Sequence, residues 1–132
     1  MKITADTNVL VRAIVADDPK QARIAQSTLK SAELVAITST AMCEFVWVLA
    51  RGYGVSPADI GAAIRQLLAS ASVEANRPAI EAGLAALDDG GDFADGVIAF
   101  DGATLGGDAF ASFDKDAVKL LKRQGLDVVL LG

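Results

Sequence analysis

The sequence contains no histidine and a single cysteine, Cys43, among its 132 residues. Without histidine, Ser-His-Asp catalysis, Cys-His catalysis and any histidine-bound metal are excluded. A lone cysteine rules out an intrachain disulfide and a thiolate zinc site. Any catalysis must therefore use carboxylates, hydroxyls, lysine, arginine or a metal ion bound by oxygen atoms.

Long apolar runs are missing as well. The longest is Phe45–Ala50, far short of the roughly 18 residues that a membrane span needs. Near the N-terminus, Asp6 stands where a signal peptide would have its apolar stretch. The length and the 52% share of hydrophobic residues are typical of one globular domain. We therefore expect a single domain over residues 1–132, in the cytoplasm and without a membrane partner.

Basic residues are outnumbered by acidic ones, 12 against 17, which gives a net charge of −5. A protein that binds nucleic acid by simple electrostatic attraction would be basic. The excess of acid leaves open an enzyme whose carboxylates are concentrated at a cation site. One dense basic cluster could follow RNA phosphates, although the solvated face of a helix is the interpretation we favour for it. This cluster comprises Lys115, Lys119, Lys122 and Arg123.

Short β-type runs alternate with amphipathic helical stretches along the chain. The predicted strands are Ile3–Asp6, Leu34–Thr38, Ser72–Ala75, Ala109–Phe113 and Val128–Leu131. The predicted helices run from Asp18-Pro19 to about Lys30, over Ser39–Arg51, from Ser56-Pro57 through Leu68, around Ile80–Leu87, from Asp92 through Phe100, and from Asp114 to near Gly125. This alternation predicts an α/β fold with a mostly parallel sheet covered by helices on both faces. In such folds the functional site lies at the carboxyl ends of the strands.

Two acids lie at the carboxyl ends of predicted strands: Asp6 is the last residue of the first strand, and Asp114 comes directly after Ala109–Phe113. Parallel strands place their carboxyl ends on one edge of a sheet, so the two side chains could converge there. Taken singly, each is better explained as the cap of the turn or helix that follows, and it is the convergence of the two that favours a site.

Glu44 is the only charged residue within Ala41–Ala50. A carboxylate on so apolar a helix is costly to bury unless it is paired or bound to a metal ion. We favour a cation ligand. The alternative is that Glu44 reaches solvent on a narrow polar strip or pairs with Arg51.

Asp95 would occupy the third helical position after an Asp92 cap, where a carboxylate favours the helix dipole. Capping explains it as well as a role in a site does. Three or four converging carboxylates, however, cannot all stay ionised without a counter-charge. Oxygen ligands alone indicate Mg²⁺ or Mn²⁺, and such an ion can activate water and stabilise a phosphodiester undergoing displacement.

Four segments, in order along nearly the whole chain, resemble the motifs of PIN-domain ribonucleases, and most closely those of VapC-type toxins from bacterial toxin–antitoxin pairs. The segments are Asp6–Arg12, Glu44–Leu49, Asp92–Ala99 and Ser112–Asp116. The resemblance implies a three-layer fold with a central sheet of four to five short strands. It also implies a toxin that cleaves RNA and is inhibited by a cognate antitoxin.

By the same resemblance, an acidic cluster binds Mg²⁺ or Mn²⁺ and performs catalysis: Asp6, Glu44, Asp95 and Asp114. Thr7 or Asn8, together with Ser112, would orient these carboxylates. Asp116 is a rival for the fourth position, but we prefer Asp114 because it directly follows the strand. Two departures from the family pattern, Gly96 and Ser112, are expected to bear on helix stability rather than on activity.

We also expect a homodimer, because the helices over Phe45–Ala50 and Ile60–Leu68 carry more apolar surface than one small sheet easily buries. The antitoxin would lay an apolar face along the Phe45–Tyr53 or Ile60–Leu68 helix and insert an Arg or Lys among the carboxylates. Trp47 and Tyr53 could stack on bases, but we expect them in the core or at an interface.

Two other classes of function compete with the nuclease. One is a phosphatase-like hydrolase with Asp6 as nucleophile, which would want a second aspartate two residues later, where this chain has Asn8. The other is a catalytically inactive module that binds nucleic acid or protein. The phosphatase gives Glu44 no role, and the retention of all four acids argues against the inactive module.

Overall fold

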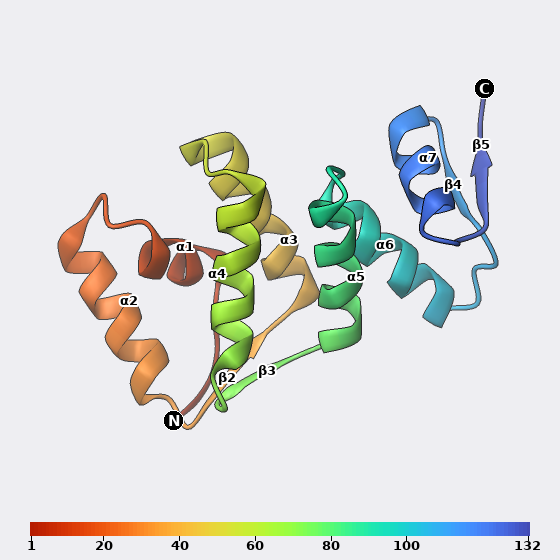
Figure 1. The fold of residues 1–132 in the computed structure, drawn as a ribbon. Coiled ribbons are helices and arrows are strands. Elements are labelled where there is room, and N and C mark those ends of the chain that lie inside the picture. Colours follow the sequence, from red (N-terminus) through yellow and green to blue (C-terminus); the bar gives the residue numbers. More distant parts are fainter. The chain divides into compact units, whose positions relative to one another are not determined.

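The computed structural model describes every residue from 1 to 132. It divides into two compact units, Met1–Asn76 and Arg77–Gly132 (Figure 1). Each unit has its own helices and its own parallel sheet. None of the helices combines the length and the apolar character that crossing a membrane requires.

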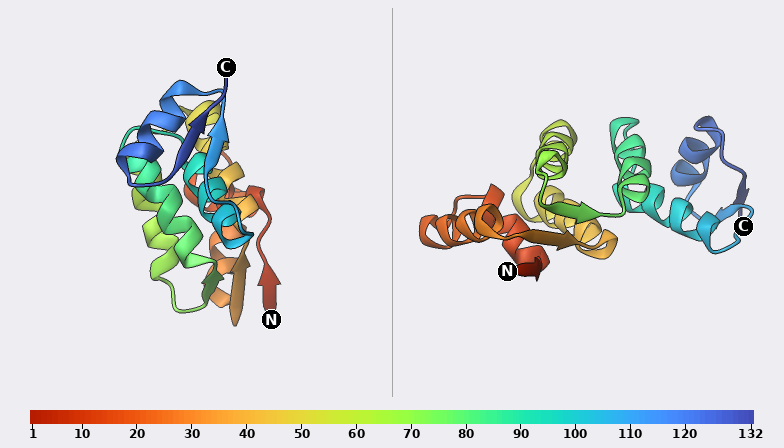
Figure 2. Two further views of the ribbon diagram at one scale, coloured as in Figure 1. Left: turned by 90° about the vertical axis from the view of Figure 1, so that its right-hand side faces the viewer. Right: turned by 90° about the horizontal axis from the view of Figure 1, so that it is seen from below.

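The first unit consists of three short strands and four α-helices, with a π-helical turn at Val48–Gly52. Its elements are β1 (Lys2–Thr4), α1 (Thr7–Ile14), α2 (Pro19–Ser31), β2 (Leu34–Ile37), α3 (Ser39–Trp47), α4 (Pro57–Ala69) and β3 (Val73–Ala75). The strands lie side by side in the order β1-β2-β3 and are all parallel (Figure 2). In the middle strand, Val35 is opposite Ile3 on one side and Val73 on the other.

Helix starts in the first unit follow from capping residues. The side chains of Asp18, Thr38 and Ser56 each accept a hydrogen bond from a backbone N–H in the first turn of the helix that follows. These bonds satisfy N–H groups that have no partner within the helix. The core of the unit is apolar and includes Leu10, Val35, Met42, Phe45, Leu49, Ile60 and Ile64, all fully buried.

The second unit has three helices and two strands. Its elements are α5 (Arg77–Asp88), α6 (Phe93–Thr104), β4 (Phe110–Ser112), α7 (Lys115–Arg123) and β5 (Val128–Leu130). The two strands pair in parallel, with Ala111 opposite Val129. Ala86, Leu120 and Leu121 form a buried cluster in which Phe110 and Val128 also pack.

Helices α5 and α6 approach closely at two glycines. A Cβ atom on Gly83 would lie 2.6 Å from the Phe93 ring, and one on Gly96 would collide with the Ala82 carbonyl oxygen. Such separations are shorter than carbon atoms tolerate, so larger residues would push the helices apart. Glycine at position 96 therefore allows α5 and α6 to pack this closely.

The predicted fold class is confirmed: the chain is mixed α/β, and every strand pairing is parallel. Two details differ. Helix α1 lies where no helix was predicted. The predicted Ser39–Arg51 helix is regular only to Trp47, after which the backbone continues as the π-helical turn.

Candidate functional site

The first unit brings Asp6 and Glu44 together through Thr7. Asp6 is the N-cap of α1, and its Oδ1 accepts a hydrogen bond of 2.8 Å from the Thr7 backbone N–H. The Thr7 hydroxyl donates a bond of 2.9 Å to Oε2 of Glu44 on α3. This bond joins α1 to α3, between residues that are 37 positions apart in the sequence. One threonine thus contacts both carboxylates, one through its backbone and one through its side chain.

Within its own unit, the Glu44 side chain is exposed. The helix turns Met42, Phe45 and Val46 into the core, so Glu44 lies on the opposite, solvent-facing side. Glu44 therefore reaches solvent, as the alternative of a polar strip describes, and its role as a cation ligand stays a prediction. Its bond partner is Thr7 and not Arg51.

A pocket of about 350 Å³ opens beside these acids. Its lining comprises Asp6, Thr7, Asn8, Val11, Arg12, Glu44, Val48 and Tyr53. A second hollow shares Asp6, Thr7 and Glu44 with this pocket and is also lined by Thr38 and Thr40. Carboxylate, hydroxyl and amide oxygens dominate the polar lining, and such oxygens suit a hard divalent cation.

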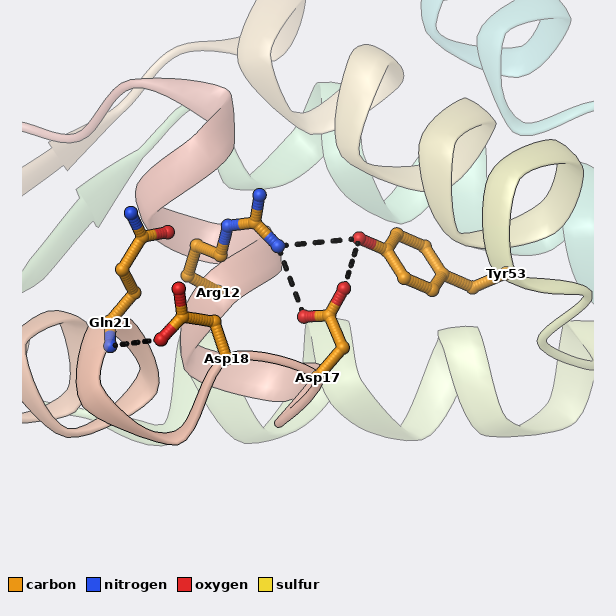
Figure 3. A network of polar contacts seen from close by, with 5 residues as sticks. All are labelled: Arg12, Asp17, Asp18, Gln21 and Tyr53. Carbon is orange, nitrogen blue, oxygen red and sulfur yellow. Dashed lines mark hydrogen bonds and ion pairs between the residues drawn. The ribbon is translucent and has the colours of Figure 1, made fainter.

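Arg12 in this pocket belongs to a network of polar contacts with Asp17 and Tyr53 (Figure 3). Its Nη1 is 3.0 Å from Asp17 Oδ1 and 3.5 Å from the Tyr53 hydroxyl oxygen. The Tyr53 hydroxyl in turn donates a bond of 3.1 Å to Asp17 Oδ2.

Both charged members of this network are held in their ionised forms. The hydrogen bond and the charge of Asp17 raise the pKa of Arg12. Partial desolvation acts to raise the pKa of Asp17, but the hydrogen bonds from Tyr53 and Arg12 outweigh it, and this pKa is lowered.

The second unit brings together another group of acids. Asp92 is the N-cap of α6 and accepts a bond of 3.1 Å from the Ala94 N–H, and Asp95 lies in the first turn of the same helix. Asp95 is half-buried. Its pKa is raised, first by desolvation and then by the negative charges of Asp92 and Asp114. The Asp95 carboxylate is therefore in surroundings that disfavour its charge, and a nearby cation would relieve that cost.

Asp114 caps the next helix, α7. Its Oδ1 accepts bonds of 3.0 and 3.1 Å from the backbone N–H groups of Asp116 and Ala117, while its own N–H donates to Ser112 Oγ at 3.0 Å. Asp116 lies inside the first turn of α7 and is exposed. The structure thus has Asp114 at the junction of β4 and α7, where the sequence predicted it. Which of the two acids is functional stays a prediction.

The predicted site residues therefore fall into two sets: Asp6, Thr7, Asn8 and Glu44 in the first unit, and Asp95, Ser112, Asp114 and Asp116 in the second. Neither unit by itself gathers three acidic side chains in a geometry that could hold a metal ion. A site made of all four catalytic candidates stays a prediction. The donors in each set fit a magnesium or manganese ion, because all are oxygens and carboxylates lie close together in both.

Arg12, Asp17 and Tyr53 were not identified as site residues from the sequence. The missed signal was helical spacing: Asn8 and Arg12 are four residues apart and share a face of α1. Tyr53 was expected in the core or at an interface, but it is 39% exposed, and Trp47 is 63% exposed. Both aromatics therefore lie outside the core of the first unit.

The sequence pattern of the PIN domain family matches residues 3–123. The match covers most of the chain and extends over both units, so the chain belongs to the PIN-domain family. PIN domains have a nuclease fold, are typically hydrolases and commonly use divalent metal ions. No curated protein shows significant similarity to the chain.

Proposed function

We propose that this protein is an endoribonuclease that hydrolyses RNA phosphodiester bonds with Mg²⁺ or Mn²⁺. The observation that carries the proposal is the pairing of carboxylates in both units of a PIN-domain chain, Asp6 with Glu44 and Asp95 with Asp114. We assign these four acids to the metal ion and to catalysis.

A bound divalent ion would supply hydroxide near neutral pH and neutralise charge on the phosphate being displaced. The protein's own contribution is orientation. Thr7 restrains one oxygen of Glu44 through its hydroxyl, and two backbone N–H groups fix Oδ1 of Asp114. In each carboxylate the other oxygen is left available to a cation.

Cleavage of a labelled RNA by the purified protein tests the proposal. We expect cleavage with Mg²⁺ or Mn²⁺, none with EDTA, and a loss of at least about 100-fold in Asp6→Asn, equal to roughly 3 kcal/mol of transition-state stabilisation. Asp59→Asn is the matched control, since Asp59 is an exposed acid in the first turn of α4. Cleavage that persists in EDTA and in Asp6→Asn would refute the assignment. RNA binding without cleavage would support the inactive module.

We further propose that the protein is the toxin of a type II toxin–antitoxin pair and acts in the cytoplasm. A groove of about 390 Å³ on the first unit supports docking of an apolar peptide. It is lined by α1, α2 and α4 residues that include Ile14, Leu29, Ala63 and Leu67. An Arg or Lys of that peptide would pair with the carboxylates and stand in for the charge of the metal ion.

The toxin assignment predicts a small protein encoded next to this chain, and coexpression of the two tests it. We expect the two to copurify, RNA cleavage to be inhibited, and cleavage to return when the inserted basic residue is changed to Ala. A neighbour that binds without affecting cleavage, or that does not bind, would overturn this half of the proposal and leave the nuclease assignment standing.

We also propose a homodimer, but the surface that we assign to its interface differs from the one expected from the sequence. The apolar side chains of Phe45, Ile60 and Ile64 are buried within the first unit and so are not free for a partner. Trp47 on α3, which is largely exposed, is the side chain that a second copy would cover. Light scattering of wild type and Trp47→Ser at micromolar concentration should give dimer and monomer masses, and a monomeric wild type would contradict the proposal.

A further inference from the structure

We propose that Arg12 binds a backbone phosphate of RNA in the pocket that also holds Asp6 and Glu44, and that Asp17 and Tyr53 position it there. The identification of the anion as RNA rests on the proposed function. The position of the guanidinium rests on contacts within the first unit alone.

A phosphate can enter this pocket only if a positively charged side chain of the protein lies there as well. Two carboxylates line it, Asp6 and Glu44, and they repel a phosphodiester. Arg12 is the one basic side chain in the lining. A metal ion bound by the carboxylates would offset their charge at one point only. A second positive group a short distance away would hold the RNA chain and set its direction through the site.

The contacts of Arg12 leave it available for this purpose. Asp17 and Tyr53 both contact Nη1, and Nη2 points away from them (Figure 3). The side chain is 36% exposed, so the guanidinium is partly open to solvent. Arginine presents several N–H donors in a planar fork that matches phosphate oxygens. One edge of this fork is held by the protein, and the other is free for a ligand.

By holding Arg12 in place, Asp17 and Tyr53 also keep it from forming an ion pair with the carboxylates of the pocket. A flexible arginine in this pocket could fold onto Asp6 or Glu44 and form an ion pair that competes with a cation. Asp17 lies in the loop after α1 and Tyr53 follows the π-helical turn, so two segments restrain Nη1. The restraint keeps Arg12 beside the acids without neutralising them, and it reduces the entropy lost when RNA binds.

Binding of a fluorescent single-stranded RNA, measured by anisotropy in EDTA so that no cleavage occurs, tests the inference. The salt concentration is varied between about 50 and 300 mM, because each phosphate contact contributes about 0.7 to the slope of log Kd against log salt for single strands. We expect Arg12→Gln to weaken binding about 10-fold and to lower the slope by about 0.7. The control Arg23→Gln removes an exposed arginine from α2 and should change neither quantity.

Two further variants separate phosphate binding from a structural role. Arg12→Lys keeps the charge and should keep the salt slope, with affinity between those of wild type and Arg12→Gln. Tyr53→Phe removes the hydroxyl and should weaken binding about two- to threefold without changing the slope. A purely structural Arg12 would instead lower the melting temperature in step with affinity and leave the slope unchanged.

The outcomes distinguish this inference from the proposed function. If wild type cleaves RNA and Arg12→Gln binds it with the wild-type affinity and slope, the phosphate contact is refuted and the nuclease assignment stands. If wild type binds RNA in the Arg12-dependent way but never cleaves, the nuclease assignment fails and the phosphate contact stands. A wild type that neither binds nor cleaves RNA refutes both. If Arg12→Gln does not fold, Arg12→Met, which also removes the charge, takes its place: a slope lowered by about 0.7 supports the phosphate contact, and the wild-type slope refutes it.

Discussion

The two carboxylate pairs have different surroundings. In the first unit, Asp6 and Glu44 are exposed, share the Thr7 donors, and line a pocket with Arg12. In the second, Asp95 is half-buried and its pKa is raised by desolvation and by Asp92 and Asp114. Solvent and protein hydrogen-bond donors therefore stabilise the negative charges of the first pair. In the second pair the charge of Asp95 is destabilised, and a bound cation would remove that destabilisation. We infer that the second unit gains more from metal binding, and the first contributes more to holding RNA.

The units agree in one respect, because each has a candidate acid at a helix N-cap. Asp6 caps α1 and Asp114 caps α7. Asparagine caps a helix about as well as aspartate does. An Asp→Asn change at these positions therefore removes the charge with little effect on helix stability, which separates catalysis from folding.

The largest expected effect is on RNA cleavage by variants of one acid from each unit. Glu44→Gln and Asp95→Asn should each remove most activity, a loss of at least about 100-fold, because both are proposed to bind the metal ion. Single-turnover cleavage assays measure this loss. The exposed acids Glu74 and Glu81 provide controls as Glu74→Gln and Glu81→Gln. Loss confined to one unit would show that the other unit's acid is not part of the site.

Asp114 and Asp116 are expected to differ in both stability and activity. Asp114→Ala should lower the free energy of unfolding by about 1 kcal/mol, because two N–H groups of α7 lose their acceptor. Asp116→Ala should cost less than about 0.5 kcal/mol, as is usual for an exposed site. Urea unfolding measures both. In cleavage assays Asp114→Asn should be inactive and Asp116→Asn active, and the reverse pattern would transfer the fourth position to Asp116.

Removing the Thr7 hydroxyl tests whether its hydrogen bond to Glu44 orients that carboxylate for RNA cleavage. Thr7→Val should lower the cleavage rate about 5-fold, since one net hydrogen bond contributes about 1 kcal/mol. Thr7→Ser retains the donor and should restore most of that rate. Equal rates in Thr7→Val and wild type would mean that this bond does not orient Glu44 for catalysis.

The raised pKa of Asp95 predicts a gain in stability when its charge is removed. A carboxyl with a raised native pKa favours folding while protonated, and this contribution is lost as the pH rises through that pKa. In EDTA at neutral pH, Asp95→Asn should therefore melt about 2 °C higher than wild type. Mg²⁺ should raise the melting temperature of wild type more than that of Asp95→Asn. A lower melting temperature for the variant in EDTA would contradict the electrostatic contrast between the units.

The smallest effect concerns Asp17, whose pKa is lowered. A carboxyl with a lowered native pKa contributes stability above its unfolded pKa, about 3.9, and loses it as the pH falls through the native value. Asp17→Asn should therefore melt slightly below wild type at pH 7, and the difference should shrink in acid. Thermal melts at several pH values measure this. A difference that is constant with pH would mean that the charge of Asp17 plays no part.

Much of the fold was predictable because its signals are local. The helix starts at Asp18-Pro19, Ser56-Pro57 and Asp92 were predicted from capping residues and are confirmed. Helix α1 was missed because Asp6 was interpreted as the end of a strand, although it caps a helix that begins at the next residue. Which strands pair within each unit has no local signal, since each pairing joins segments that are distant in the sequence.

The sequence by itself determined the chemistry that is available. With no histidine and one cysteine, oxygen ligands and carboxylates were the remaining means of metal-dependent catalysis, and their types and order along the chain indicated the family. Only the tertiary structure decided which groups meet. The bond from Thr7 to Glu44, the contact of Arg12 with Tyr53 and the effect of Asp114 on the pKa of Asp95 all involve residues that are distant in the sequence. A side chain's charge and donors are properties of the residue, whereas its partners and its desolvation depend on long-range packing.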